Sequence, residues 1–139
     1  MILPRPLRLA VCTAALTLAS LSPLRAAEPL SEADSKFMTL YDQVQKALVM
    51  NNLEGVKTAA HALPDGAGAD VEKAKDIKAA RTAFGPLSEK AIKIAANDPE
   101  YHVFNCPMVN KDWVQRSNKI ANPYMGADML TCGVEKKKP

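Results

Sequence analysis

The sequence is poor in aromatic residues, histidine and cysteine, and these shortages limit the chemistry that it can perform. Aromatic residues make up 5% of the 139 residues, and the chain has 2 histidines and 3 cysteines. It contains no doubled Cys-x-x-Cys motif, no glycine-rich loop of the kind that binds phosphate, and no group placed to orient a histidine as a general base. The sequence therefore favours a protein that is not an enzyme.

Long hydrophobic runs are also absent, apart from one near the start. Residues 1–26 contain three arginines, no acidic residue and an apolar run over residues 9–21. This composition is typical of a secretory signal peptide. The run is too short to span a bilayer, which takes about 20 apolar residues, and no later segment approaches that length. We therefore expect a periplasmic or secreted protein with no membrane span in the mature chain.

Positive charge is scarce once the predicted signal peptide is set aside. The whole chain has a formal net charge of +3 and a pI of about 8.8. The three arginines of residues 1–26 account for this excess, so the mature chain would carry equal numbers of basic and acidic side chains. Binding to nucleic-acid phosphates needs a clustered cationic surface. The charge balance therefore gives no support to a nucleic-acid partner.

Apolar residues recur at helical spacing in the first part of the predicted mature chain. Ser31 resembles the start of a capping box, and the apolar stripe behind it predicts a helix that ends near Met50. Asn52 is a predicted N-cap for a shorter second helix, which a proline and two glycines end. Residues 30–96 are thus expected to form helical hairpins within a single domain of residues 27–134.

A third helix is predicted to begin near Asp70, because an apolar stripe runs from there to Ile94. The register of this stripe passes Gly85-Pro86 without a slip, so we expect one long helix that kinks at the proline. The alternative is two helices that break at Gly85. In both cases the predicted fold class is all-α, a small bundle of three to four helices, one of them kinked.

The character of the sequence changes after residue 96. Four of the seven aromatic residues and three of the ten prolines lie within residues 97–124. Residues 97–134 are therefore interpreted as a loop region stapled by aromatic residues, rich in cysteine and methionine, with short elements only. Residues 135–139 are expected to form a frayed, solvated tail.

Both cysteines of the predicted mature chain lie in this loop region, with three methionines and a histidine. An extended stretch would place His102, Cys106 and Met108 on one side, because side chains alternate along a strand. A helical turn would align Met125, Met129 and Cys132 along one face. Soft sulfur ligands select Cu(I) or Ag(I) over hard divalent cations. The candidate metal ligands are therefore Cys106, Cys132, Met108, Met129, His102 and Met125.

A structural disulfide between Cys106 and Cys132 is the competing interpretation. Exported domains with an even number of cysteines most often form disulfides. Closing a loop of about 25 residues would stabilise the folded state by roughly 3–4 kcal/mol, through the entropy that the unfolded chain loses. Methionine is also a flexible core residue, so Met125 and Met129 each have a packing role as an alternative. In this interpretation the protein is a disulfide-stapled helical interaction module without metal.

Several short motifs recur in an order that is typical of one bacterial family. They are Arg81, Phe84, Leu87, Ser88, Cys106-Pro107-Met108, Trp113, Asn122-Pro123-Tyr124, Gly126, Met129-Leu130 and Cys132-Gly133. Through them residues 36–134 resemble a family of small domains of unknown function, which occur alone behind a signal peptide or as the C-terminal extension of periplasmic adaptor subunits of copper and silver efflux pumps. Met125 stands where the family has phenylalanine, which makes it a less secure ligand.

The resemblance implies a periplasmic heavy-metal context, which places soft-metal binding above the disulfide. On this basis we expect an exported protein that binds Cu(I), or Ag(I), for sequestration or for transfer to a heavy-metal efflux adaptor or pump. Cys106 and Cys132 would be its thiolate ligands. Met108 and Met129 would complete a site of low coordination number, and His102 is a weaker candidate.

Overall fold

Helices and then a three-stranded antiparallel sheet make up the described part of the chain, residues 29–139 of a computed structural model. The predicted signal peptide lies outside the described residues. The α-helices are α1 (Glu32–Val49), α2 (Leu53–His61), α3 (Ala69–Glu72) and α4 (Ile77–Ile94). The strands are β1 (His102–Cys106), β2 (Lys111–Gln115) and β3 (Val134–Lys136), and two 3₁₀ turns are η1 (Pro64–Gly66) and η2 (Gly126–Met129).

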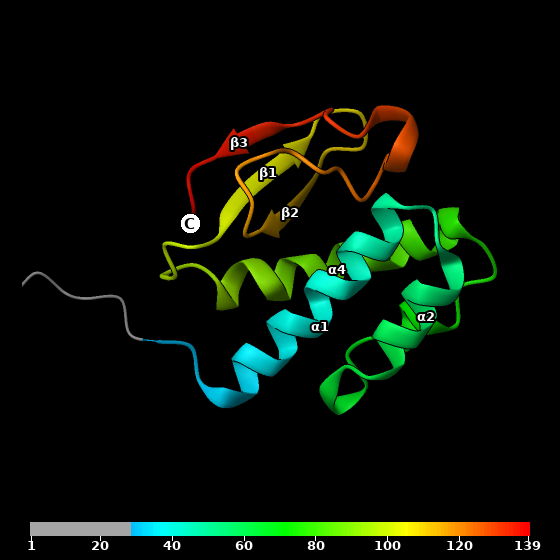
Figure 1. Ribbon diagram of the computed structural model, residues 1–139, viewed down its shortest axis with the longest axis horizontal. Coiled ribbons are helices and arrows are strands. Elements are labelled where there is room, and N and C mark those ends of the chain that lie inside the picture. Colours follow the sequence, from blue (N-terminus) through cyan, green and yellow to red (C-terminus); the bar gives the residue numbers. More distant parts are fainter. Residues whose placement is uncertain (1–28) are drawn as a thin grey trace, which may run out of the picture.

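The all-α prediction is wrong, because a sheet follows α4 where a loop region was expected. The strands are ordered β2-β1-β3, and the fold is mixed α/β. Figure 1 shows the sheet on one side of the helices, with α4 running along it. Residues 135 and 136, expected in a frayed tail, belong to β3, and the Lys138 ammonium donates to the carbonyl of Asp98.

The first two helices follow their predicted capping residues. The Ser31 hydroxyl accepts a hydrogen bond from the amide of Asp34 at 3.1 Å and begins α1, whose C-cap is Met50. The Asn52 side chain accepts from the amide of Gly55 at 2.9 Å and begins α2. Each side chain satisfies an amide that has no partner inside its helix. The two predicted N-caps are confirmed.

The third predicted helix is divided in the structure. α3 ends at Glu72, and α4 begins only after Asp76, whose carboxylate accepts from the amide of Ala79 at 2.7 Å. The expectation of one helix from residue 70 is therefore wrong at its start, because a capping aspartate interrupts the apolar stripe. The expectation of continuity at Gly85 is correct, since α4 runs through Pro86.

Both faces of the sheet are buried near its centre. The adjacent residues Val103 and Phe104 of β1 are 3% and 1% exposed, and Trp113 and Val114 of β2 are fully buried. Phe104 and Trp113 are directly paired across the strands, and their rings stack with centroids 5.4 Å apart. Because neighbouring residues are buried on opposite faces, the sheet has a covered surface on each side.

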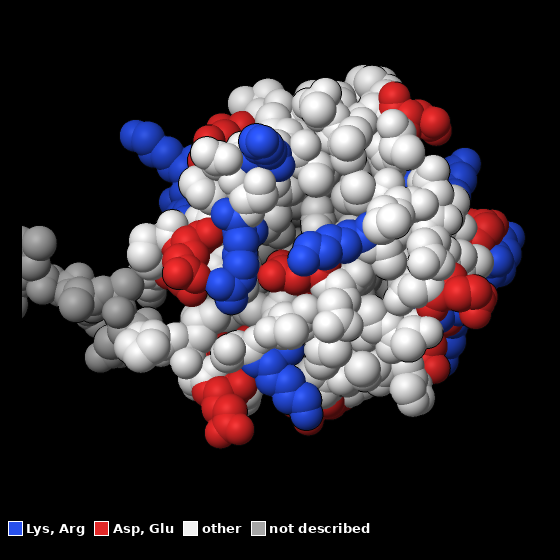
Figure 2. Space-filling model, viewed as in Figure 1, with Lys and Arg blue, Asp and Glu red and all other residues white. Residues whose placement is uncertain are grey.

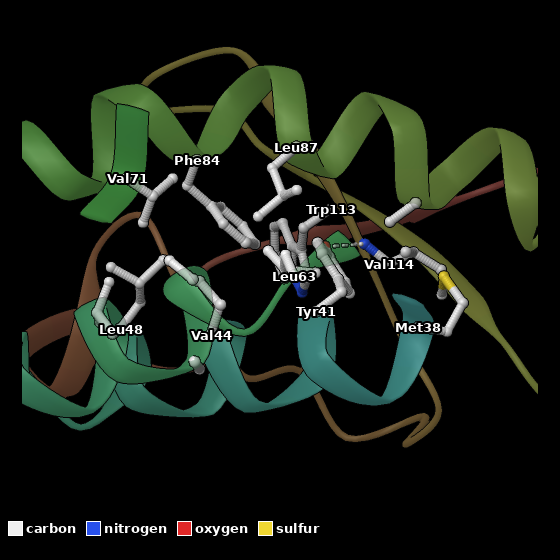
Figure 3. Close-up of a cluster of buried hydrophobic side chains, with 14 of the residues drawn as sticks. Met38, Tyr41, Val44, Leu48, Leu63, Val71, Phe84, Leu87, Trp113 and Val114 are labelled. Carbon is white, nitrogen blue, oxygen red and sulfur yellow. Dashed lines mark hydrogen bonds between the residues drawn. The ribbon is translucent and has the colours of Figure 1, made fainter. Parts of the chain in front are cut away.

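The core joins the helices to the sheet through the ring of Tyr41. Its ring stacks on Phe84 of α4 at 5.3 Å, and its hydroxyl accepts from the amide of Val114 in β2 at 3.3 Å. Figure 3 shows these residues between α1 and α4, with the bond to Val114 dashed. Ser88 lies within hydrogen-bond distance of the same hydroxyl, at 2.9 Å. The two layers therefore share one core.

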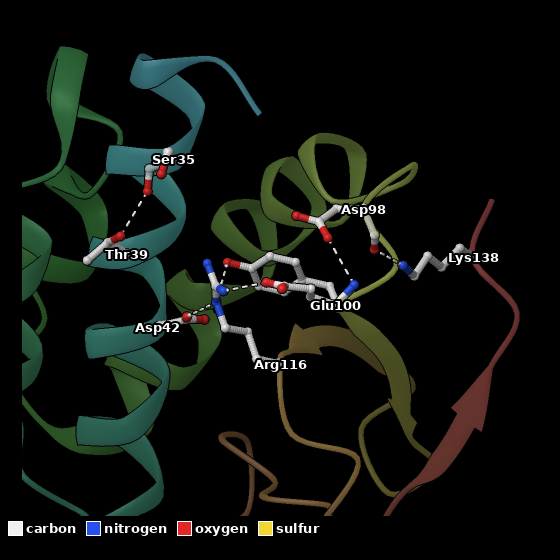
Figure 4. Close-up of polar contacts among 8 residues, drawn as sticks. Ser35, Thr39, Asp42, Asp98, Glu100, Arg116 and Lys138 are labelled. Atoms are coloured by element: carbon white, nitrogen blue, oxygen red, sulfur yellow. Dashed lines mark hydrogen bonds and ion pairs between the residues drawn. The ribbon is translucent and has the colours of Figure 1, made fainter. Parts of the chain in front are cut away.

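Arg116 fastens the chain after β2 to the helices. Its Nη1 donates to Glu100 at 2.8 Å and its Nε donates to the Tyr101 hydroxyl at 3.1 Å, while Asp42 of α1 lies 3.7 Å from Nε (Figure 4). Burial raises the pKa of the Asp42 carboxyl, although the charges of Arg116 and Lys46 lower it in part. This cluster fixes the end of the sheet at which β1 begins.

Candidate metal centre at one end of the sheet

The antiparallel pairing of β1 and β3 brings both cysteines to the same end of the sheet. Asn105 of β1 is paired with Val134 of β3. Cys106 follows the first of these residues, and Cys132 lies two positions before the second. The same register, continued past β3, places Gly133 opposite Cys106. The two thiols therefore lie on neighbouring segments although 26 positions separate them in the sequence.

The backbone around Cys132 is held by hydrogen bonds and by a close aromatic contact. The amide of Cys132 donates to the carbonyl of Met129 at 3.1 Å, and the side chain of Asn122 donates to the carbonyl of Cys132. The next residue is Gly133, where a Cβ atom would lie 2.7 Å from the indole of Trp113. Only glycine lets the backbone pass the indole so closely, so the position of Cys132 is fixed by its neighbours.

Both cysteines are free thiols in the structure, but they differ in exposure. Cys106 is completely buried, whereas Cys132 is partly exposed. A metal ion that reached both sulfur atoms would approach from the side of Cys132. Cys106 would then be the inner ligand and Cys132 the outer one.

The methionines that were candidate ligands fall into two groups. Met108, in the turn between β1 and β2, is 62% exposed, and Met129, at the end of η2, is 40% exposed. Neither side chain serves as core filler. Met125 is partly buried and packs against the core. The two exposed thioethers thus lie on the connection that follows Cys106 and on the one that carries Cys132, whereas the side chain of Met125 packs against the core.

The structure does not bring His102 to this end of the sheet. His102 begins β1 and Cys106 ends it, so at about 3.3 Å per residue their Cα atoms are roughly 13 Å apart. The Nδ1 atom of His102 instead lies 2.9 Å from a carboxylate oxygen of Glu135 in β3. Of the six candidate ligands, Cys106 and Cys132 lie on neighbouring segments at this end, and Met108 and Met129 lie two and three positions from them in the chain.

Two buried groups near this end, Asn122 and Tyr124, belong to the motifs of the resemblance but had no structural role assigned from the sequence. Asn122 is completely buried, and its side-chain oxygen accepts from the amides of Tyr124 and Met125 at 2.9 and 3.2 Å. Because the same side chain also donates to the carbonyl of Cys132, Asn122 holds the backbone at Tyr124, Met125 and Cys132 together. The signal in the sequence was the Asn-Pro dipeptide, which favours a turn.

The second of these groups is the phenol of Tyr124, which donates to the carbonyl of Asp112 at 2.8 Å. Burial raises the pKa of Tyr124 well above its usual value, the hydroxyl of Ser88 lowers it in part, and the negative charges of Asp112 and Glu89 raise it further. The phenol is therefore neutral at physiological pH. A thiolate at Cys106 would have an uncharged tyrosine near it.

Within residues 29–139, no group of three histidine, cysteine or carboxylate side chains is placed to hold a metal ion. Over the same residues, no helix combines the length and the apolar character needed to cross a membrane. Comparison with protein-family models, with curated proteins and with solved structures finds no match for this chain.

Proposed function

We propose that the protein binds a soft monovalent metal ion, Cu(I) or Ag(I), at the end of the sheet where β1 and β3 meet. The observation that supports this proposal is that two free thiols lie on neighbouring segments there, each within three residues of an exposed thioether. Polarizable sulfur binds d¹⁰ monovalent ions more strongly than it binds hard divalent cations.

The four sulfur atoms have different tasks in this proposal. Cys106 and Cys132 each lose a proton and bind the ion as thiolates, so binding of one ion releases two protons. Met108 and Met129 are neutral at any pH and provide further donors at the exposed rim. Because the thiols must be deprotonated, the apparent affinity falls as the pH is lowered.

An exported protein with this site would sequester the ion or transfer it to a heavy-metal efflux adaptor or pump. The exposed thioethers support transfer to a partner. A ligand of the partner can replace Met108 or Met129 in the coordination sphere before the ion dissociates from the buried thiolate of Cys106. Ligand exchange of this kind needs donors at the surface, and the structure has them on both connections.

The test is an anaerobic titration of the reduced protein with Cu(I) in competition with a chromophoric chelator. The variant with Cys106→Ser and Cys132→Ser is expected to lose competitive binding, because a hydroxyl is a poor ligand for a soft ion. His102→Gln is the matched control, since His102 lies at the other end of β1, and it should bind as the unaltered protein does. Retained binding in the double serine variant would reject the thiolate assignment.

A disulfide-stapled module without metal is the rival function. Intact mass of untreated protein separates the two, because the oxidised pair weighs about two hydrogen masses less than the dithiol. The proposal would be overturned in favour of this rival if protein isolated from the cell envelope contained a disulfide that resists reduction and did not bind copper.

A further inference from the structure

A cavity near the turn between β1 and β2 is lined by charged and apolar side chains, in contrast to the sulfur ligands of the candidate metal centre. It has a volume of about 290 Å³ and is formed by the first half of α4, the turn between β1 and β2, and the ring of Tyr124. Its lining contains three cationic side chains and no acidic one. The lining residues are Lys78, Arg81, Thr82, Val109, Lys111 and Tyr124.

Arg81 is held rigidly by uncharged acceptors. Its Nε donates to the carbonyl of Pro123 at 2.9 Å, and its Nη2 donates to the carbonyl of Leu48 at 3.0 Å and to the side chain of Asn51. Its Nη1 makes no hydrogen bond within residues 29–139. Burial lowers the pKa of Arg81 and the charge of Asp128 raises it, yet the guanidinium keeps its charge. The structure thus presents a fixed cation with a donor to spare.

Two lysines complete the positive lining. Lys78 is placed one helical turn before Arg81 on α4, and Lys111 begins β2. The ammonium of Lys111 would lie only 3.4 Å from a Cβ atom at Gly85, so its side chain lies across the helix at that glycine. Neither lysine forms an ion pair in the described part of the chain. No carboxylate lines the cavity with these three cations, and Asp128, whose charge acts on Arg81, lies outside the lining.

A neighbouring cleft is also lined by lysines but contains acidic side chains as well. It has a volume of about 680 Å³ between α4 and the sheet, and it is lined by lysines together with Glu89 and Asp112. Lys136 donates to Asp112 at 2.7 Å there. Figure 2 shows basic and acidic side chains interspersed over the face of the molecule that it views. Lys111 also lines that cleft, where carboxylates accompany the lysines, whereas the charged residues that line the smaller cavity are all cations.

The smaller cavity also has an apolar wall. The hydroxyl of Tyr124 is occupied by its bond to the carbonyl of Asp112, so toward the cavity its ring offers carbon atoms. Val109, which is 46% exposed, adds a second apolar surface. A ligand that filled this space would have an anionic group at the cations and a small apolar body against Tyr124 and Val109.

We propose that this cavity binds a small organic carboxylate, with its carboxylate at Arg81, Lys78 and Lys111 and its apolar part against Tyr124. The planar guanidinium matches a carboxylate in shape, and the two ammonium groups add charge from either side. The site is independent of the metal centre and needs no metal ion.

Benzoate is a suitable probe, because it combines one carboxylate with an apolar ring. The reduced, metal-free protein is labelled with ¹⁵N and titrated with benzoate, with benzyl alcohol and with inorganic phosphate. We expect benzoate to shift the backbone amide signals of Thr82, Val109 and Tyr124, and to bind more tightly than either other probe. Equal binding of benzyl alcohol would show that the cations are not used, and equal binding of phosphate that the apolar wall is not used. Either result overturns the proposal.

Two double variants locate the site. Lys78→Gln with Lys111→Gln should weaken benzoate binding about fivefold, since two exposed charge contacts of modest strength are removed. Lys57→Gln with Lys75→Gln removes the same charge from positions outside the lining and should leave binding unchanged. Equal loss in both variants would mean that only net charge matters, which also overturns the proposal. Lys78 and Lys111 are exposed, so neither double variant is expected to disturb the fold.

Discussion

The two ends of the sheet differ in how their side chains are satisfied. At the end where β1 begins, charged groups pair with one another: His102 with Glu135 at 2.9 Å, and Arg116 with Glu100 at 2.8 Å. At the other end, the sulfur atoms of Cys106 and Cys132 are free, and the nearby methionine side chains are exposed. At the first end the charged side chains have partners within the protein, whereas at the second end the sulfur atoms are free donors.

This difference separates groups that hold the fold from groups that are available to a ligand. Side chains that satisfy each other, such as Arg116 and Glu100, contribute to stability and leave little for binding. An exposed thioether such as that of Met108 gains nothing from its position in the fold, because it neither packs in the core nor donates a hydrogen bond. We therefore expect substitutions at the first end to change stability and substitutions at the second end to change metal affinity.

Trp113 lies between the two ends, and its removal should have the largest effect. The indole stacks on Phe104, meets the ring of Tyr124 at 6.3 Å and donates to Gln115 at 2.9 Å. Trp113→Ala should reduce the free energy of unfolding by about 3–5 kcal/mol, because it leaves a large cavity. Urea denaturation followed by circular dichroism measures this loss. A loss below about 1 kcal/mol would show that the ends do not depend on this shared core.

The exposed methionines offer the next largest effect, and here affinity should change without stability. Met108→Ser with Met129→Ser should lower the affinity for Cu(I) about tenfold, a difference of about 1.4 kcal/mol, while the urea midpoint stays the same. Chelator competition and denaturation of the same samples provide both values. Leucine at the two positions is the matched control, because it keeps the apolar bulk and lacks sulfur, so it should lose affinity equally.

At the opposite end the expected pattern is reversed. Arg116→Met removes the bonds to Glu100 and Tyr101 and the contact of the guanidinium with the Tyr101 ring, whose centroid is 4.8 Å away. Because the arginine side chain is half-exposed, we expect a loss of about 1 kcal/mol in unfolding free energy. The affinity for Cu(I) should not change. A variant that kept its stability but bound less copper would contradict the division between the ends.

The smallest effect concerns pH and lies at Asp112, which is paired with Asn105 next to the end of β1. Burial raises the pKa of Asp112, but hydrogen bonds from Lys136 and Asn105 and the charge of Lys136 outweigh it and leave the pKa below its usual value. A carboxyl with a lowered pKa in the folded state adds stability above the pKa of the unfolded chain, about 3.9, and loses it as the pH falls further. Lys136→Met should therefore flatten the acid side of the stability profile.

We expect the difference between this variant and the unaltered protein to stay below about 1 kcal/mol, since both side chains are partly exposed. Urea denaturation at a series of pH values from neutral to strongly acidic measures it. Parallel profiles for the two proteins would show that Lys136 does not lower the pKa of Asp112.

The helices were largely predictable because their signals are local. Ser31 and Asn52 cap their helices as expected, and each needs only a few neighbours to do so. The strands were missed because their burial does not alternate. Val103 and Phe104 are both buried, one on each face, so β1 lacks the period of two that marks a strand with one solvated face. Asp76 could have revealed the break before α4, since aspartate is a preferred N-cap.

The candidate site was predicted in composition more than in geometry. The sequence placed Cys106 and Cys132 in one segment, and strand pairing accounts for their approach. It also grouped His102 with Cys106 on one side of an extended stretch, without the length of β1 that separates them. The exposure of Met108 and Met129 depends on which residues cover the sheet, and long-range packing decides that.

The short strand β3 has a consequence for the behaviour of the protein at high concentration. Its three residues, Val134, Glu135 and Lys136, are all exposed and form one border of the sheet. A strand from another molecule that paired with β3 could form few backbone hydrogen bonds, because β3 is short, and would have to desolvate an acidic and a basic side chain. Addition of a strand from another molecule at this border is therefore unfavourable.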